Sequence, residues 1–224
     1  MYFSHEVISD NSAIAEYVKR TYGVDSHVIA YGGDHAVAVD AATVDEYNLP
    51  ESFAFSVCRI EPENNVHVIL DVFSKLAAHP LVIVGNWSNS QYGSKLRERY
   101  ASCNNLYLLD SIYDLGKLKT LRSRASFYMH GHSAGGTNPS LVEAMHFGKA
   151  VLAFDCDYNR CATEDKALFF KDGEDLQQLI KSLDKTVSEK VGQDLVDIAN
   201  RRYTWHIIAG QYFTLIDKSY RSQT

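Results

Sequence analysis

From residue 53 onward, short apolar runs alternate with longer segments in which apolar residues recur every three or four positions. The short runs have the length of buried strands, and they cover residues 53–58, 81–85, 105–109, 127–129, 150–154 and 167–170. The longer segments predict helices with one apolar stripe each, such as Val68, Ile69, Val72, Phe73 and Leu76, or Leu115, Leu118 and Leu121. Strict alternation of strands and helices predicts an α/β fold with a doubly wound parallel sheet.

The first fifty residues stand outside this alternation. Residues 6–9, 12–22 and 27–31 predict one further strand, helix and strand, which Gly32, Gly33 and Asp34 close. Near the other end, residues 201–205 interrupt a helix, and residues 207–220 predict a last one. The chain therefore divides into residues 1–50, a sheet domain at 51–202, and a terminal helix region at 203–224.

Residues 125–143 predict an anion-binding site. An apolar strand end at 125–129 leads into Gly135 and Gly136, then Asn138 suits a helix N-cap and Pro139 the first helical position. Free amides and the positive end of the helix dipole would face a phosphate there. Glu143 lies about 7.5 Å further along the axis, within reach of a hydroxyl group of the same ligand. The alternative is an ordinary helix whose glutamate has no ligand.

Composition excludes several classes. The chain has 224 residues, 46% of them apolar, and a formal net charge of −6, which argues against nucleic acid as a partner. No apolar run has the length of a membrane span and no export signal is present, so we expect a cytoplasmic protein. The four cysteines are scattered, and we expect mostly buried thiols. His130 and His132 alone do not make a metal site.

One local basic stretch runs against the overall charge. Lys117, Lys119, Arg122 and Arg124 follow one another at close spacing. They could meet an anionic membrane surface or a lipid-linked acceptor, but we predict a solvated helix face.

Two motifs resemble glycosyltransferase family 4. The sequence Gly-Gly-Thr-Asn-Pro-Ser-Leu-Val-Glu-Ala-Met at 135–145 resembles its nucleotide-sugar motif, and Arg-Ile-Glu-Pro-Glu-Asn-Asn at 59–65 resembles the loop after its first donor-domain strand. Residues 81–85 and 107–114 fall where that family has its second strand and its base-binding loop, so the resemblance covers roughly residues 50–215. It implies a Rossmann-like, C-terminal donor-binding half of a GT-B enzyme, preceded by a leftover β-α-β unit of the acceptor domain.

The same resemblance implies a function. The parent enzyme would transfer a sugar with retention from a UDP-, dTDP- or GDP-sugar to a cell-surface glycan or lipid-linked acceptor, without metal or other cofactor. It would need roughly 150 more N-terminal residues, an ordinary domain, and would work at the inner face of the plasma membrane. We expect a truncated form or a natural half-protein that is inactive alone and that dimerises through residues 1–50. The alternative is a non-catalytic nucleotide-sugar-binding module that needs a partner chain.

Site roles follow from the family motifs. Arg59 would bind the diphosphate and stabilise the leaving group, and His132 would donate to a phosphate or sugar oxygen. Glu143 would accept both ribose hydroxyls. The other expected donor contacts are Asn64, Ile112, Tyr113, Gly135, Gly136, Thr137 and Asn138. Alternatives remain open, since Arg59 could instead pair with Glu61 or Glu63, and His132 could be a packed histidine.

Two positions depart from the family pattern. Gly135 stands where the family has a glutamate eight positions before Glu143, and Asn64 stands where it has a lysine five positions after Arg59. Both changes resemble a subgroup of bacterial capsule and cell-wall glycosyltransferases in polysaccharide biosynthesis, including rhamnosyltransferases. Both changes weaken what the resemblance implies about catalysis more than what it implies about donor binding, and we name no catalytic base.

Overall fold

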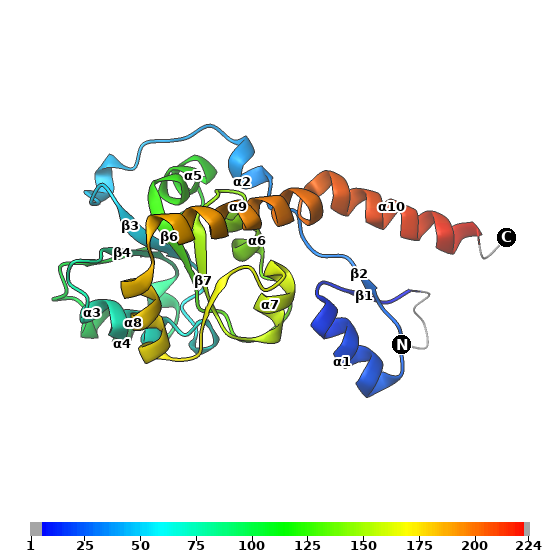
Figure 1. The fold of residues 1–224 in the computed structure, drawn as a ribbon, viewed down its shortest axis with the longest axis horizontal. Helices are drawn as coiled ribbons and strands as arrows, with labels where there is room; N and C mark the ends of the chain where they lie inside the picture. The colour runs from blue at the N-terminus through cyan, green and yellow to red at the C-terminus, as the bar shows by residue number, and fades with distance from the viewer. Residues whose placement is uncertain (1–5, 222–224) are drawn as a thin grey trace.

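The computed structural model describes residues 6–221, which contain a six-stranded and a two-stranded parallel sheet (Figure 1). The larger sheet has the order β5-β4-β3-β6-β7-β8. Its strands are β3 (Phe53–Val57), β4 (Leu81–Val84), β5 (Leu106–Leu109), β6 (Ala125–His130), β7 (Ala150–Phe154) and β8 (Leu168–Phe170). The predicted doubly wound sheet is confirmed.

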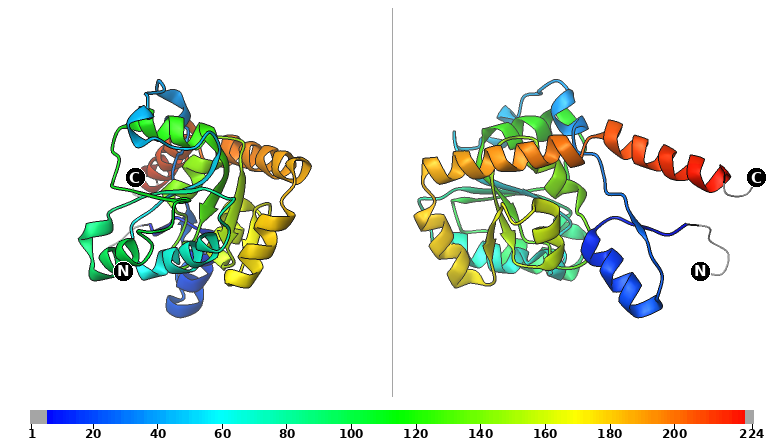
Figure 2. Two further views of the ribbon diagram at one scale, coloured as in Figure 1. Left: turned by 90° about the vertical axis from the view of Figure 1, so that its left-hand side faces the viewer. Right: turned by 45° about the vertical axis from the view of Figure 1, so that its right-hand side comes forward.

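Helices cover both faces of this sheet (Figures 1 and 2). On one face lie α3 (Val66–Ser74), α4 (Gln91–Arg99) and α8 (Gly173–Ser182), where α3 packs on α8. On the other lie α5 (Leu115–Arg124), α6 (Pro139–Met145), α7 (Asp157–Thr163) and α9 (Lys185–Arg202), where α9 packs on β7 and α6. Short helices connect them, namely α2 (His35–Ala38) and the 3-10 turns Asp45–Tyr47, Pro62–Asn64 and Trp87–Asn89.

Burial on both faces explains why these segments form strands. All four residues of β4 are at most 1% exposed, as continuous apolar runs in a parallel sheet should be. β6 is longer than the predicted 127–129, because its first residue pairs with Phe53 of β3 and its last, His130, with Ala153 of β7. Pairing with two neighbours thus extends a strand beyond its apolar run.

The strand order reverses between β3 and β6. Chain order runs from β3 outward to β5, and then returns to β6 on the other side of β3. In such sheets the ligand crevice lies beyond the carboxyl ends of the two strands where the order reverses. Here the loop after β3 carries Arg59 and the loop after β6 carries the Gly135-Gly136 turn, so both predicted motifs lie at this point.

The N-terminal unit forms its own small parallel sheet. It comprises β1 (Ile8–Ser9), α1 (Ser12–Tyr22) and β2 (His27–Val28), with strands shorter than predicted. The last helix, α10 (Trp205–Arg221), extends past the main sheet above this unit, where its Ile208 and Leu215 pack on Ile29 (Figure 1). Residues 1–5 and 222–224 of the predicted end regions lie outside the described residues.

The basic stretch on α5 is not a solvated face, so that prediction was wrong. Lys119 Nζ donates to the carbonyls of Val37 and Val39, and Arg124 to that of Pro50. Lys117 pairs with Glu46 at 2.5 Å, and Arg122 is 3% exposed. These side chains hold the segment between α2 and β3 against the sheet domain. The four cysteines are free and partly exposed, where we expected mostly buried thiols.

His130 makes the stability of this fold sensitive to pH. Burial, helped by nearby His132, lowers the pKa of His130 from 6.5 to about 3. As the pH falls, His130 is therefore protonated in the unfolded chain before it is protonated in the folded one. Neutral His130 contributes fully to the free energy of unfolding above pH 6.5, and this contribution is lost as the pH falls towards 3. As the pH falls from 6.5 towards 3, we expect the wild type to lose free energy of unfolding faster than a His130→Leu variant. The difference between the two slopes should reach up to about 1.4 kcal/mol per pH unit.

Urea unfolding of both proteins between pH 7 and pH 4.5 measures this difference. The remaining titrating groups are shared, so they cancel in the comparison. Parallel pH profiles would show that His130 is not held neutral in the fold.

Candidate active site

A cavity of about 410 Å³ opens at the carboxyl ends of β3 and β6. It brings together the loop after β3, the loop after β6, the start of α6 and one side of α5. The lining residues are Val57, Cys58, Arg59, Asn64, Leu118, Arg122, His132, Asn138, Pro139, Ser140 and Glu143. Two motifs that are more than seventy residues apart in the sequence thus share one cavity.

The loop after β3 is held rigidly against the loop after β6. A Cβ placed on Gly131 would lie 2.1 Å from the carbonyl oxygen of Asn64, so only glycine permits this approach. Asn65 donates to the Gly131 carbonyl at 2.9 Å, and the backbone N–H of Ser133 to that of Glu63 at 2.9 Å. The two loops form one continuous floor for the cavity.

Arg59 and Asn64 have different roles in this floor. Asn64 is 5% exposed, and its amide donates to the Arg59 carbonyl at 2.9 Å while its Oδ1 contacts His132 Nδ1 at 2.9 Å. The Asn64 side chain thus shapes the loop. Arg59 is exposed, and within residues 6–221 its guanidinium makes no hydrogen bond or ion pair, including none with Glu61 or Glu63. Arg59 therefore keeps its five donors available at the cavity wall.

His132 lies beneath the glycine turn. A Cβ placed on Gly135 would lie 3.4 Å from His132 Nε2. Burial lowers the pKa of His132; Glu63 opposes this shift and Arg59 adds to it. Because the Asn64 amide oxygen accepts from His132 Nδ1, Nε2 of the neutral ring is an acceptor. The predicted donation from His132 to a phosphate or sugar oxygen therefore requires the protonated ring.

The turn into α6 has the geometry that the sequence predicts. Gly135 has φ +107°, which other residues rarely adopt. Asn138 caps the helix, since its Oδ1 accepts from the Ser140 N–H at 3.0 Å, and Pro139 follows at the first helical position. Thr137 is buried and its hydroxyl donates to the Asp10 carbonyl at 2.7 Å, so its side chain serves packing.

Glu143, one turn into α6, has both carboxylate oxygens engaged. Its Oε2 pairs with Arg122 of α5, and its Oε1 lies 3.2 Å from Nε2 of His35. Neither partner was predicted from the sequence. Arg122 falls within a basic run that looks solvated, and His35 stands in an unpatterned connection, so no local signal marks either residue. Glu143 lines the cavity together with Arg59 and Asn138, and its contact with ribose hydroxyls stays a prediction.

Ile112 and Tyr113 are not among the residues that line the cavity. They follow β5, which is separated from β3 by β4, and the Tyr113 side chain is 89% exposed. Their contact with a nucleotide base stays a prediction.

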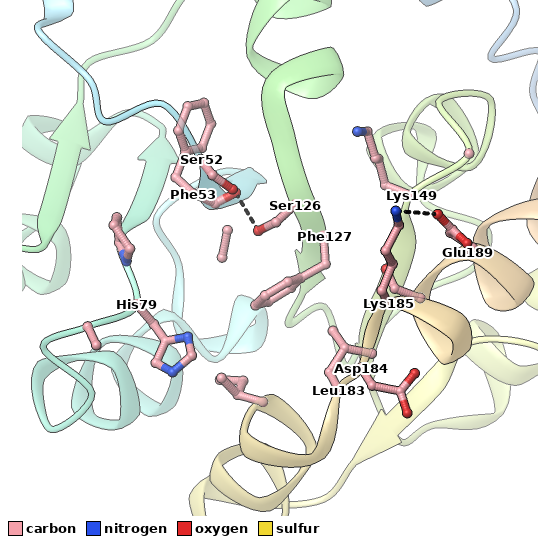
Figure 3. A pocket seen from close by; sticks show the side chains of 16 residues that line it. Ser52, Phe53, His79, Ser126, Phe127, Lys149, Leu183, Asp184, Lys185 and Glu189 are labelled. Carbon is pink, nitrogen blue, oxygen red and sulfur yellow. Dashed lines mark hydrogen bonds and ion pairs between the residues drawn. The ribbon is translucent and has the colours of Figure 1, made fainter.

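A second cavity, of about 560 Å³, lies at the amino ends of the strands, opposite the cavity of Arg59 and Glu143 (Figure 3). Its walls come from residues that precede or begin strands, such as Ser52, Ser126 and Lys149, and from the start of α9, where Lys185 pairs with Glu189 at 3.7 Å. Ligands of open parallel sheets bind beyond the carboxyl ends of the strands. We therefore place the candidate site at the cavity of Arg59 and Glu143.

Comparison with known proteins identifies the family. The family model described as glycosyl transferases group 1 matches residues 44–204, which include both motifs and the whole sheet. The chain belongs to the group 1 glycosyl transferases. The fold agrees, because this group 1 chain superposes on the sucrose-phosphate synthase of Thermosynechococcus elongatus with a TM-score of 0.81 at 18% identity, covering 96% of this chain and 58% of that one. The predicted GT-B C-terminal, Rossmann-like domain is confirmed.

Two further proteins resemble this group 1 glycosyl transferase. A glycosyltransferase from Rickettsia africae superposes with a TM-score of 0.81 at 12% identity, covering 96% of this chain and 63% of that one. The phosphatidyl-myo-inositol mannosyltransferase of Mycobacterium tuberculosis is 29% identical over 226 positions, which cover 92% of this chain and 59% of that protein. The chain thus spans somewhat more than half the length of the curated relatives it matches.

The contact between the two loops yields a stability prediction. Gly131→Ala should lower the free energy of unfolding by about 1–3 kcal/mol, because the new methyl group must push the Asn64 backbone away. Gly210→Ala in α10 is the matched control. No atom of residues 6–221 outside the local helix backbone lies within 4 Å of its added Cβ, and a helical Gly→Ala change should stabilise by about 0.5–1 kcal/mol. Chemical denaturation of both variants measures the effect. A Gly131 variant as stable as wild type would disprove the close approach.

Proposed function

We propose that this chain is the donor-binding part of a glycosyltransferase that takes a sugar from a nucleoside diphosphate carrier. The observation that carries the proposal is the arrangement around one cavity: the unpaired Arg59 guanidinium, the capped start of α6 and the Glu143 carboxylate all border it. Arginine and the backbone N–H groups of the glycine turn before α6 suit the diphosphate, and the carboxylate suits the ribose hydroxyls.

This arrangement fits the chemistry of glycosyl transfer. When the bond from the anomeric carbon to the diphosphate breaks, negative charge grows on the leaving oxygen and positive charge on the sugar ring. Donors fixed in advance lower the barrier when they bind the developing charge more strongly than the ground state. Arg59, the backbone N–H groups of residues 136–138 and, when its ring is protonated, His132 are the donors we assign to the leaving diphosphate. Asn64 holds the loop on which Arg59 lies. No residue is assigned as a base.

The relatives support the proposal and suggest its finer points. The structural neighbour TarM from S. aureus, in a variant form, is known in complex with UDP and α-GlcNAc-glycerol, and superposes with a TM-score of 0.68 at 16% identity over 94% of this chain and 43% of that one. The curated relative is named for a lipid, phosphatidyl-myo-inositol. We propose retention, metal-independent donor binding, and an acceptor of the glycan or lipid-linked class. Within residues 6–221, no helix is long and apolar enough to cross a membrane.

Calorimetric titration with UDP, dTDP and GDP, each with and without EDTA, tests the proposal. We expect micromolar to sub-millimolar binding of at least one of them, unchanged by EDTA, because the donors in the cavity are protein groups. Absence of binding by all three would remove the donor-binding function from this chain.

Arg59→Ala separates phosphate binding from nucleoside binding. Loss of a charge-assisted hydrogen bond should lower the affinity for a nucleoside diphosphate by about 10- to 100-fold, while the affinity for the nucleoside alone stays nearly constant. Arg99→Ala, a change of an exposed arginine on α4, serves as the matched control. Equal losses for both ligands in the Arg59 variant would contradict its assignment to the phosphates.

A further inference from the structure

Arg122 is a buried cation at the wall of the cavity. Its side chain is 3% exposed, it lines the cavity together with Glu143 and Leu118, and it pairs with Glu143 Oε2. Its Nε is buried and has no hydrogen-bond partner among the described residues. A guanidinium loses its hydration on burial, and the contacts of Arg122 with the Glu143 carboxylate and with the Phe147 ring, whose centre lies 5.9 Å from the Arg122 Cζ, compensate for only part of this cost. A donor left unpaired beside a cavity indicates a site that is completed by another group.

The two partners of Glu143 differ in how easily a ligand can replace them. Arg122 comes from α5 inside the sheet domain and is almost fully buried. His35 comes from the connection after β2, and its side chain is 36% exposed. His35 Nδ1 also accepts from the Trp205 indole N–H at 3.1 Å, so it retains a partner if it leaves Glu143. A ligand can therefore displace His35 from Oε1 at far lower cost than Arg122 from Oε2.

We propose that Arg122 is the positioning residue of Glu143 and that the vicinal diol of a ribonucleotide takes the place of His35. This inference rests on the proposed function. Arg122 fixes the orientation of the Glu143 carboxylate through Oε2, which leaves Oε1 to accept from the hydroxyls. The unpaired Nε–H supplies a donor for a hydroxyl oxygen that moves in with the ligand, so that acceptor and donor together match the two-sided hydrogen bonding of a diol.

Titration of UDP and GDP, each against its 2′,3′-dideoxy analogue, tests the inference in the full chain. The variants are Arg122→Met, which keeps length without charge, Arg122→Lys, Glu143→Gln and the double variant Arg122→Met/Glu143→Gln. Arg124→Met is the matched control, because Arg124 lies two residues away and is not among the residues that line the cavity. Its guanidinium donates to the Pro50 carbonyl and lies 5.6 Å from the centre of the Phe53 ring.

We expect Arg122→Met to lower the affinity for the ribonucleotide about 10- to 100-fold while barely changing that for the dideoxy analogue. The double variant should be no weaker than Glu143→Gln, because Arg122 acts through Glu143, and Arg122→Lys should recover part of the loss. The Arg124 variant should match wild type. The double variant leaves no unpaired buried charge, so its thermal stability separates a binding effect from a failure to fold.

Two results would overturn the inference alone: ribonucleotide binding that survives Arg122→Met, or equal losses for the ribonucleotide and its dideoxy analogue. In both cases the wild type still binds nucleotide and the proposed function stands. If the wild type binds neither UDP nor GDP, nor dTDP in the earlier series, the proposed function fails first and the inference fails with it.

Discussion

The parallel pairing of β3 with β6 is the constraint on which the site depends. These two strands are neighbours in the sheet although β4 and β5 come between them in the chain. The loops that follow β3 and β6 therefore begin side by side, at the carboxyl ends of the two strands. Gly131 then lets the backbone of one loop touch the backbone of the other. A Cβ at this position would push apart the two loops that carry Arg59 and the glycine turn.

The sheet could be predicted from the sequence because its strands are buried on both faces. Such strands are continuous apolar runs, and the runs at 81–85 and 150–154 match β4 and β7 to within a residue. Strand ends were harder to place. β1 and β2 are shorter than their apolar patterns, since each has one partner in the described sheet and part of its surface stays exposed. The helix at 12–22 was predicted at its observed ends. In the structure Asn11 caps its start and Gly23 follows its last residue.

The site was predictable only where its chemistry is contiguous in the sequence. The turn from Gly135 to Asn138 is a local motif, and the structure shows its conformation and cap as expected. Arg122 was misinterpreted because its burial depends on Glu143, twenty-one residues further along the chain, and on a crossover that no local pattern encodes. Asn64 was predicted as a ligand contact, yet its amide is used inside the protein. A polar side chain near a site can thus be a scaffold for the residues that meet the ligand.

The N-terminal unit meets the glycine turn and α6 at two separate points. Asn11 donates to the Thr137 hydroxyl at 3.1 Å, and a Cβ on Gly136 would lie 1.8 Å from Asp10 Oδ1, so the unit touches the glycine turn directly. The connection that follows β2 makes the second contact, where Gly33 packs on the α6 backbone and His35 pairs with Glu143. Because packed contacts shift as discrete arrangements and not by continuous deformation, a movement of this unit must change the surroundings of Thr137, Glu143, or both. The same contacts that hold the unit in place therefore link its position to the state of the donor cavity.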